Sequence, residues 1–431
     1  DGVLMGVPIL TEPEAAGSNF NVPRSTFVDC MKALKEDARL ALEGLPWEYG
    51  DAAEMQRLSA KYAGADQSKV TRVFGANFIG RMSGKVVEAF VAKADLLAAS
   101  PAYSDQSGVD WKTAAASAAK VLNHIGGVDG MDPTGWTWYC NADDIENLSP
   151  TESPAEILWR GERAKSLSLE EDNFPPTLYG NGRINPTQNL VDAFPMLNGY
   201  PVSHQSGEYD ENLPYANRDP RLEAYILYNG GKAGNTNKEI FTAADGTTND
   251  ALNKVVGRST RTGYYLRKLL RQDISLDPNA KADQYHYTPR IRYTEIFLAY
   301  AEAANQAYGP QNKGGNSYSA YDVMKKLRHR AGIGLDNGDA YLESIKNDQA
   351  KMAELIRNER RIELCFEGFR FWDLRRWKSN LTEAAKGMNI SGTRYTPMEV
   401  DKRSFSEYMY YGPIPYSEVL KYDELKQNQG W

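Results

Sequence analysis

The sequence has few of the side chains that most often bind metals or form disulfides. It contains three cysteines and four histidines among 431 residues. Cys30, Cys140 and Cys365 lie far apart, and no two of them have the C-x-x-C spacing of a metal ligand pair. We therefore expect buried thiols, with one disulfide and one leftover thiol as the alternative, and we predict no metal site and no cofactor.

The sequence also lacks an excess of positive charge and long hydrophobic runs. Its 50 Lys and Arg residues are outnumbered by 57 Asp and Glu residues, which gives a formal net charge of −7. Nucleic-acid binding needs clustered cations that contact phosphates, so this balance argues against a nucleic-acid partner. A membrane-spanning helix needs about eighteen consecutive apolar residues, and the sequence contains no such run.

Catalytic sequence motifs are missing as well. The histidines are isolated, and no His-Glu-x-x-His zinc motif, Gly-x-Ser-x-Gly nucleophile elbow or Walker loop occurs. Gly180-x-Gly182 lacks the third glycine of a dinucleotide-binding turn. The sequence therefore predicts a protein that is not an enzyme.

Aromatic residues, by contrast, are abundant. There are 26 tyrosines and 8 tryptophans, and hydrophobic residues make up 41% of the chain. This composition supports a large folded core. Aromatic rings mostly fill cores, but an exposed ring also packs against the C–H face of a sugar.

Apolar residues recur at helical spacing in two parts of the chain, the N-terminal third and the region from about residue 290 onward. Ser25 or Thr26 is a candidate cap for the first helix. The predicted helices cover about residues 26–42, 85–99, 111–125, 290–304, 319–331, 341–366 and 371–377. Paired helices of this length, with small residues where they cross, resemble tetratricopeptide hairpins.

The region from 127 to 284 has a different character. It is rich in glycine, proline, asparagine and aspartate, with turn signals such as Asn198-Gly199. Only short strands are expected, at about 223–228 and 264–269. A long loop-rich region on a helical scaffold is typical of a binding surface.

A series of short motifs runs along almost the whole chain. The motifs are Gly6–Ile9, Pro23–Phe27, Gly80–Met82, Lys93–Pro101, Asn185–Phe194, Asn217–Leu222, Thr262–Tyr265, Ile291–Ile296, Tyr300–Ala303, Arg328–Gly332, Ile356–Leu364, Glu367–Trp377, Pro413–Pro415 and Gln427–Trp431. In this order they resemble the RagB/SusD family of Bacteroidetes surface lipoproteins. The shared order carries the resemblance more than any single motif.

The resemblance implies a mainly α fold: tetratricopeptide-like helix pairs in an α-α superhelix, with a long loop-rich insertion that carries short strands. It implies one SusD-like domain over residues 1–431. The expected parts are an N-terminal helical part at 1–126, a ligand-binding insertion at 127–284, C-terminal helix pairs at 285–379 and an extended tail at 380–431. The family's lipidated cysteine and the helical stretch after it have no match here, so we expect the first helix pair to be missing or incomplete.

The resemblance also implies a location and partners. Family members are lipid-anchored on the extracellular face of the outer membrane and pass oligosaccharides to a SusC-like TonB-dependent transporter. The expected ligand is therefore an oligosaccharide or polysaccharide, and the expected membrane contact is an N-terminal lipid anchor outside these residues. The alternatives are a RagB-type peptide-binding protein, an adaptor of the transporter that binds no ligand, and a helical glycoside hydrolase.

A candidate ion network lies near the end of the helix predicted at 341–366. It consists of Arg360, Glu363, Glu367 and Arg370. Their spacings of three or four residues would place them on one helix face if the helix continued. One interpretation makes Glu363 and Glu367 a hydrolase acid–base pair. We favour a structural network, because neighbouring arginines lower carboxylate pKa values, whereas a general acid needs a raised pKa.

Two loops offer aromatic side chains with polar neighbours, as a glycan-binding surface requires. The first loop contributes Trp136, Trp138 and Tyr139. The second contributes Tyr179, Asn181 and Arg183. In an extended first loop, Trp136 and Trp138 would point to the same face. The alternative is that Trp138 or Tyr139 anchors its loop against the helices.

Two further charged segments are predicted as turns. In Arg218-Asp219-Pro220-Arg221 the proline disfavours helix at Asp219, whose carboxylate is expected to bind neighbouring backbone N–H groups. The second segment holds Asp336, Asp339 and Glu343. Their spacing does not fit a calcium-binding loop, so we predict a solvated turn.

Overall fold

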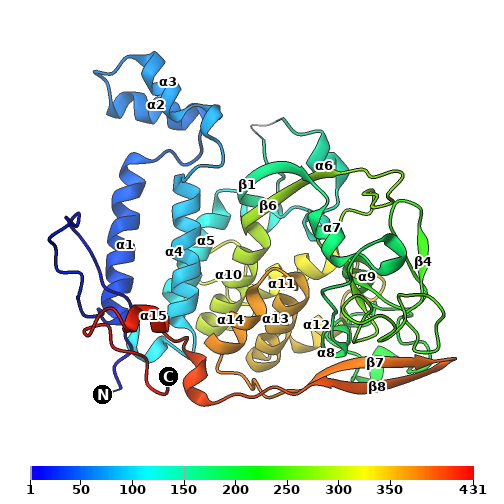
Figure 1. The fold of residues 1–431 in the computed structure, drawn as a ribbon. Helices are drawn as coiled ribbons and strands as arrows, with labels where there is room; N and C mark the ends of the chain where they lie inside the picture. Colours follow the sequence, from blue (N-terminus) through cyan, green and yellow to red (C-terminus); the bar gives the residue numbers. More distant parts are fainter. Residues whose placement is uncertain (1, 150–151) are drawn as a thin grey trace. The chain divides into compact units, whose positions relative to one another are not determined.

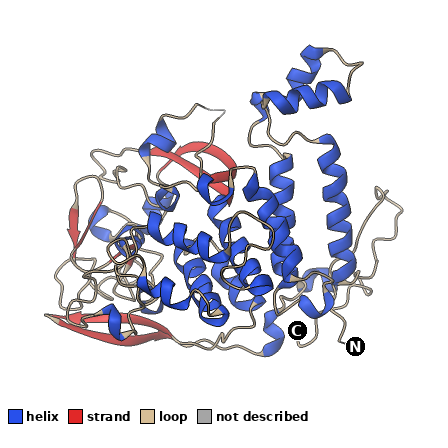
Figure 2. Ribbon diagram, turned by 180° about the vertical axis from the view of Figure 1, so that it is seen from behind, coloured by secondary structure: helices blue, strands red, loops and turns tan. Residues whose placement is uncertain are grey.

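The computed structural model describes residues 2–149 and 152–431. They fall into two units, which are described separately. Unit 1 consists of Asp1–His124, Gly368–Thr382 and Ser404–Trp431, and unit 2 of Ile125–Glu367 and Glu383–Arg403. Regular structure in unit 1 is helical, whereas unit 2 combines helices with long loops and short strands (Figure 1; Figure 2).

Unit 1 is built on α1, α4 and α5. Its helices are α1 (Phe27–Gly44), α2 (Ala52–Lys61), α3 (Gln67–Phe74), α4 (Gly84–Ala99), α5 (Trp111–Asn123), α14 (Phe369–Arg376) and α15 (Tyr416–Val419), with the short 3₁₀ helices η1 (Ala76–Phe78), η2 (Ser104–Gln106) and η7 (Glu407–Tyr410). Thr26 caps α1 by accepting a hydrogen bond from the Asp29 N–H, as predicted. Helix α4 contacts both α1 and α5. Buried alanines such as Ala89 and Ala118 allow these helices to approach closely.

The remaining helices belong to unit 2. They are α6 (Ala142–Glu146), α7 (Ser168–Asn173), α8 (Gln188–Val191), α9 (Pro220–Tyr225), α10 (Tyr293–Tyr308), α11 (Ala320–Arg330), α12 (Ala340–Ile345) and α13 (Gln349–Glu363), with η3 (Gly127–Gly130), η4 (Gly135–Thr137), η5 (Pro176–Leu178) and η6 (Gln205–Gly207). Every residue of α10 from Thr294 to Asn305 is buried, because α11 and α13 both pack on it. Figure 1 shows these three helices side by side.

The strands form four two-stranded antiparallel sheets. They pair β1 (Ile157–Ser166) with β6 (Gln284–Arg292), β2 (Ile226–Leu227) with β5 (Tyr265–Leu266), β3 (Gly231–Ala233) with β4 (Lys238–Ile240), and β7 (Ala385–Ser391) with β8 (Arg394–Asp401). An isolated two-stranded sheet is barely stable in water. The β7–β8 hairpin is supported by packing, since Met388 and Ile390 belong to a hydrophobic cluster of unit 2.

The structure confirms most of the predicted helices and corrects two elements. The helix predicted over 341–366 is two helices, because Asp348 caps a new helix and accepts a hydrogen bond from the Lys351 N–H. The strand predicted over 223–228 is mostly helical: α9 begins at Pro220, and only Ile226 and Leu227 are extended.

Two further predictions concerned the burial of the cysteines and the absence of a membrane-spanning helix. All three cysteines are free thiols, but only Cys365 is buried, so the expectation of buried thiols is wrong for Cys30 and Cys140. Within the described ranges, no helix has the length and hydropathy that crossing a bilayer requires.

Candidate ligand-binding site

The first predicted loop, with Trp136, Trp138 and Tyr139, lies in the core of unit 2. It forms a 3₁₀ turn over Gly135–Thr137, so the prediction of an extended segment is wrong. Trp138 is 4% exposed and Tyr139 is 5% exposed. Trp136 is half-buried and packs against the same cluster.

Hydrogen bonds to α9 hold this loop against the core. The Tyr139 hydroxyl donates to the Ala224 carbonyl at 3.0 Å, and the Tyr225 hydroxyl donates to the Trp136 carbonyl at 2.7 Å. A buried ring offers no face to a ligand, so the ligand role predicted for Trp138 and Tyr139 is wrong. Both anchor the loop, which was the alternative interpretation.

The second predicted loop presents Tyr179 to solvent. Its side chain is 52% exposed, although its neighbours Phe174 and Leu178 are buried. The backbone of Tyr179 has φ 66°, in the left-handed region that costs a bulky side chain about 1–2 kcal/mol. Such strain persists only where surrounding contacts hold it, and it is common at functional sites.

Backbone hydrogen bonds fold this loop onto α7. The Asn181 N–H donates to the Glu171 carbonyl at 2.9 Å, and the Arg183 N–H donates to the Asp172 carbonyl at 3.0 Å. The Arg183 guanidinium also pairs with the Asp172 carboxylate at 3.1 Å, and both side chains are largely exposed. Tyr179 is therefore an exposed ring on a hydrogen-bonded loop, with an amide and an ion pair close to it in sequence.

The two predicted loops pack into different hydrophobic clusters. Trp138 and Tyr139 belong to one hydrophobic cluster of unit 2. Phe174 and Leu178, which anchor the Tyr179 loop, belong to another. Of the six predicted ligand residues, only Tyr179, Asn181 and Arg183 remain candidates as a group.

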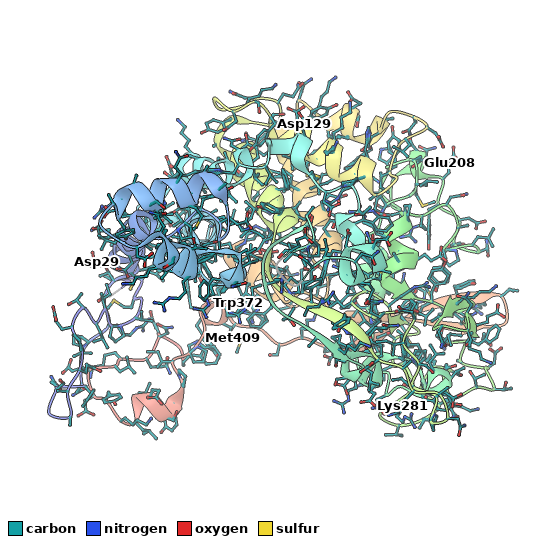
Figure 3. All side chains as sticks on the ribbon, turned by 90° about the horizontal axis from the view of Figure 1, so that it is seen from above. Asp29, Asp129, Glu208, Lys281, Trp372 and Met409 are labelled. Atoms are coloured by element: carbon teal, nitrogen blue, oxygen red, sulfur yellow. The ribbon has the colours of Figure 1, made fainter. Side chains whose placement is uncertain are left out.

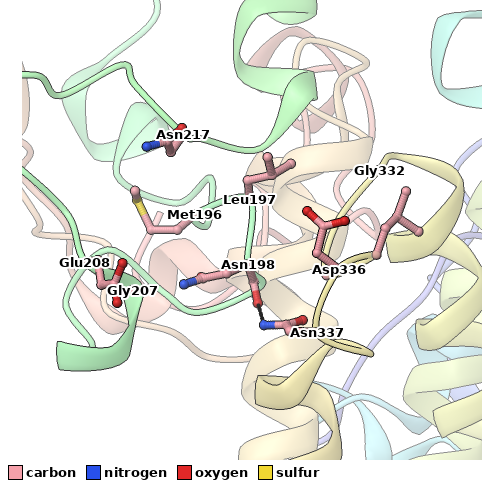
Figure 4. Close-up of a pocket in the computed structure, with 11 residues that line it drawn as sticks. Met196, Leu197, Asn198, Gly207, Glu208, Asn217, Gly332, Asp336 and Asn337 are labelled. Carbon is pink, nitrogen blue, oxygen red and sulfur yellow. Dashed lines mark hydrogen bonds between the residues drawn. The ribbon is translucent and has the colours of Figure 1, made fainter.

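A pocket that the sequence analysis missed lies elsewhere in unit 2. It has a volume of about 490 Å³. Its lining residues are Met196, Leu197, Asn198, Gly207, Glu208, Asn217, Gly332, Gly334, Leu335, Asp336 and Asn337 (Figure 4). The turn at Asn198-Gly199 and the acidic segment after Gly334 were visible in the sequence, but their proximity was not.

Ion pairs surround Glu363 and Glu367, and they include cations that the sequence analysis did not name. Helix α13 ends at Glu363 and Phe366 has φ 64°, so Glu367 does not continue the helix face. The Glu363 carboxylate lies 3.1 Å from Arg221. Glu367 pairs with Lys268 at 2.6 Å and with Arg292 at 2.7 Å.

The two predicted arginines of this network lie in different units. Arg360 is buried in α13 of unit 2, whereas Arg370 belongs to α14 of unit 1. The expectation that all four charged residues share one helix face is therefore wrong.

The surrounding cations keep the two glutamates ionised. Burial raises the pKa of Glu363, but the cations around it, Arg330 first, outweigh burial and lower the pKa to about 2. Burial likewise opposes ionisation of Glu367, and Arg292 and Lys268 lower its pKa. A wholly buried carboxylate with a lowered pKa is unsuited to donate a proton, which favours the structural interpretation over a hydrolase pair.

The predictions for the two charged segments, around Asp219 and around Asp339, have different outcomes. Asp219 accepts a hydrogen bond from the Arg221 N–H at 2.9 Å, so the prediction that it binds the backbone is confirmed. Asp339 is not solvated as predicted: it is buried and pairs with Arg328 at 2.6 Å. Among the residues with described positions, no group of three or more His, Cys, Asp or Glu side chains could hold a metal ion.

The fold combines helix pairs with a long loop-rich region that exposes the Tyr179 ring. This combination defines a class of helical scaffold proteins. The chain belongs to the SusD family, whose model matches residues 158–431. This confirms the resemblance that the ordered motifs predicted.

Curated relatives match shorter stretches. Two SusD-like proteins of Formosa agariphila are 33% identical over 85 residues and 32% identical over 152 residues. These stretches cover 20% and 35% of this chain, and 16% and 26% of the relatives' own lengths.

Solved structures match the whole chain. A SusD-like protein from Bacteroides fragilis has a TM-score of 0.72 and 25% identity, over 100% of this chain and 76% of that one. A SusD-like carbohydrate binding protein, also from Bacteroides fragilis, has a TM-score of 0.68 and 22% identity, over 98% of this chain and 76% of that one. The predicted fold class, tetratricopeptide-like helix pairs with a loop-rich insertion carrying short strands, is confirmed.

Proposed function

We propose that this protein binds an oligosaccharide or polysaccharide at the cell surface and delivers it to a SusC-like TonB-dependent transporter of the outer membrane. Membership of the SusD family supports the proposal. So does the structural likeness to a SusD-like carbohydrate binding protein. In this proposal the protein is held on the extracellular face by an N-terminal lipid anchor and has no catalytic activity of its own.

The exposed ring of Tyr179 is the observation that carries the proposed binding site. A sugar ring packs its C–H groups on an aromatic face, while its hydroxyls need polar partners around the rim. Asn181 supplies an amide two residues away, and Arg183 supplies N–H donors next to the Asp172 carboxylate. We place the ligand on this loop, within the insertion at 127–284.

The loop is held in place before a ligand arrives, which lowers the entropy cost of binding. The Arg258 side chain donates to the Gly180 carbonyl at 2.9 Å, and the Thr177 N–H donates to the Asp250 carboxylate at 2.8 Å. These contacts come from a distant part of the chain. They hold the backbone on either side of Tyr179.

Native affinity electrophoresis tests the proposal. The purified protein would be run through gels that contain plant, host or microbial polysaccharides, with product analysis of the same mixtures. We expect retardation by at least one glycan without released products. We also expect Tyr179→Ala to reduce the retardation, and Tyr416→Ala to leave it unchanged, because Tyr416 is 73% exposed but lies in unit 1.

Each other outcome has a distinct meaning. Equal retardation of Tyr179→Ala and the parent protein would move the site away from this loop. Released oligosaccharides would identify a hydrolase. No retardation by any glycan would contradict the proposal and favour a peptide ligand or an adaptor role.

A further inference from the structure

The pocket around Met196 is built from three segments that are far apart in the sequence. These are residues 196–198, the stretch from 207 to 217, and the loop at 332–337. All three belong to unit 2. Figure 3 shows Glu208 on the surface of this unit, well away from Lys281, which pairs with Glu171 of α7 beside the Tyr179 loop. The pocket and the Tyr179 loop are therefore separate surfaces.

Backbone and amide hydrogen bonds hold the pocket open. The Leu197 N–H donates to the Asn217 carbonyl, and the Gly334 N–H donates to the Leu197 carbonyl, both at 2.8 Å. The Asn337 amide donates to the Asn198 carbonyl at 2.8 Å (Figure 4). Gly334 has φ 64°, and a Cβ there would lie 2.6 Å from the Asp339 Cα, so only glycine fits this wall.

Three polar side chains of the lining are free to bind a ligand. Across residues 2–149 and 152–431, no side chain pairs with those of Glu208, Asn217 or Asp336. The amides of Asn198 and Asn337, by contrast, are already used by backbone groups. The free carboxylates and amide come from different segments and surround one cavity.

Apolar surface completes the lining. Met196 is buried at 3% exposure, whereas Leu197 and Leu335 are 38% and 62% exposed. Glu208 adopts φ 58°, a left-handed conformation that is unfavourable for glutamate. A pocket that offers apolar surface beside polar groups can take a small ligand.

We infer that this pocket is a second saccharide subsite, which takes an uncharged, hydroxyl-rich sugar unit of the glycan. The inference rests on the proposed function. Carboxylates accept hydrogen bonds from sugar hydroxyls, and the Asn217 amide both donates and accepts. The leucines and Met196 cover the C–H surface of the ring. Two sites on one chain strengthen the capture of a long polymer by avidity.

The charge of the lining selects against acidic glycans. None of the described residues that line the pocket is lysine or arginine, whereas two of them, Glu208 and Asp336, are acidic residues. A uronate or sulfate group would find no cation to pair with and would meet like charges instead. The subsite therefore favours neutral sugars.

The test uses the whole chain with defined probes. Laminarin, xyloglucan and galactomannan represent uncharged polysaccharides, and alginate and polygalacturonate represent acidic ones. Binding is measured in affinity gels, and hydrogen–deuterium exchange locates protection. The variants are Glu208→Ala with Asp336→Ala together, Leu335→Ala, and Glu211→Ala as a control, because Glu211 is exposed on the same loop but does not line the pocket.

We expect an uncharged polysaccharide to protect residues 196–208 and 332–339 from exchange. The double variant should bind it about tenfold more weakly, a change of about 1.4 kcal/mol, and Leu335→Ala should also weaken binding. Glu211→Ala should bind like the parent protein. Melting temperatures of all variants identify any loss of folding.

The outcomes separate this inference from the proposed function. If the double variant binds like the parent protein while Tyr179→Ala binds weakly, the subsite is wrong and the proposed function stands. If an acidic polysaccharide protects the pocket, the stated selectivity is wrong. If no polysaccharide is retarded at all, the proposed function fails and the inference fails with it.

Discussion

Arg221 and Glu359 face each other across the interior of unit 2, with 2.8 Å between the guanidinium Nη1 and the carboxylate Oε2 and both side chains fully buried. The same guanidinium contacts Asp219 at 2.7 Å and Glu363 at 3.1 Å. One arginine on α9 thus contacts three buried carboxylates. Because Glu359 and Glu363 belong to α13, these ion pairs connect the loop-rich insertion to that helix.

Removing this arginine should strongly destabilise unit 2. Arg221→Met would leave three carboxylates buried with fewer partners, and breaking a buried ion pair costs about 3–5 kcal/mol. Urea unfolding measures the free energy. The control is Arg183→Ala, whose partner Asp172 is 47% exposed, and which should cost about 1 kcal/mol or less. Equal losses for the two variants would contradict a stabilising role for the buried network.

The lowered pKa of Glu363 predicts loss of stability in acid. Its folded pKa of about 2 lies below the ordinary value of 4.5, so protonation favours the unfolded chain. The stabilisation is complete above pH 4.5 and is lost as the pH falls from 4.5 to 2. It amounts to on the order of 3 kcal/mol.

Glu363→Gln isolates this contribution. The variant should be less stable than the parent protein at pH 7, because the cations around the site lose a partner. Its unfolding free energy should fall less between pH 5 and pH 2. Parallel curves for the two proteins would show that Glu363 is not the titrating group.

Backbone strain at Tyr179 predicts which of two substitutions at this position leaves the protein more stable. Asparagine tolerates left-handed backbone, whereas a β-branched residue does not. Tyr179→Asn should therefore be more stable than Tyr179→Val by about 1 kcal/mol or more, although both should lose glycan binding. Chemical denaturation gives the difference. The same pair of substitutions at Tyr416, which lies in α15, serves as the comparison. An equal difference at both positions would argue against strain at Tyr179.

Trp138→Ala should affect folding rather than ligand contact. The ring is 4% exposed, and deleting a buried aromatic side chain costs about 3–5 kcal/mol. Leu213→Ala, at a position that is 62% exposed, should change stability by less than about 0.5 kcal/mol. A folded, stable Trp138→Ala protein with weakened glycan binding would restore the ligand role first predicted for this residue.

The three thiols should react at different rates. Burial raises the pKa of Cys365 to about 11, so this thiol is both inaccessible and protonated at pH 8. Cys30 is half-exposed and should be alkylated first. Mass spectrometry of iodoacetamide-treated protein measures each site, and urea should make all three react. Rapid native labelling of Cys365 would show that its surroundings open readily.

The helical scaffold could be predicted because its signals are local. The apolar spacing from Phe27 onward marked α1, and Thr26 marked its start, since a helix cap needs only a side chain three residues away. The break between α12 and α13 was missed because apolar spacing continues across it. The cap at Asp348 was the available signal.

The site was predictable only in part, because exposure is not a local property. Tyr179 and Trp138 look alike in sequence: each is an aromatic residue in a loop rich in turn-forming residues. They differ because Trp138 packs in a core with α9, whereas buried neighbours anchor the loop of Tyr179 and leave its own ring outside.

The sequence by itself determined the positions of the long helices α1, α4, α5, α10 and α11, the loop-rich character of the middle region and, through the order of its motifs, the family. The tertiary structure alone decided which aromatic rings are exposed and which cations surround Glu363, since Arg221 lies 142 residues away along the chain. It alone placed Glu208, Asn217 and Asp336 around one pocket. The physical reason is that periodicity and capping act within a few residues, whereas burial, ion pairing and pocket formation depend on segments that meet only when the chain folds.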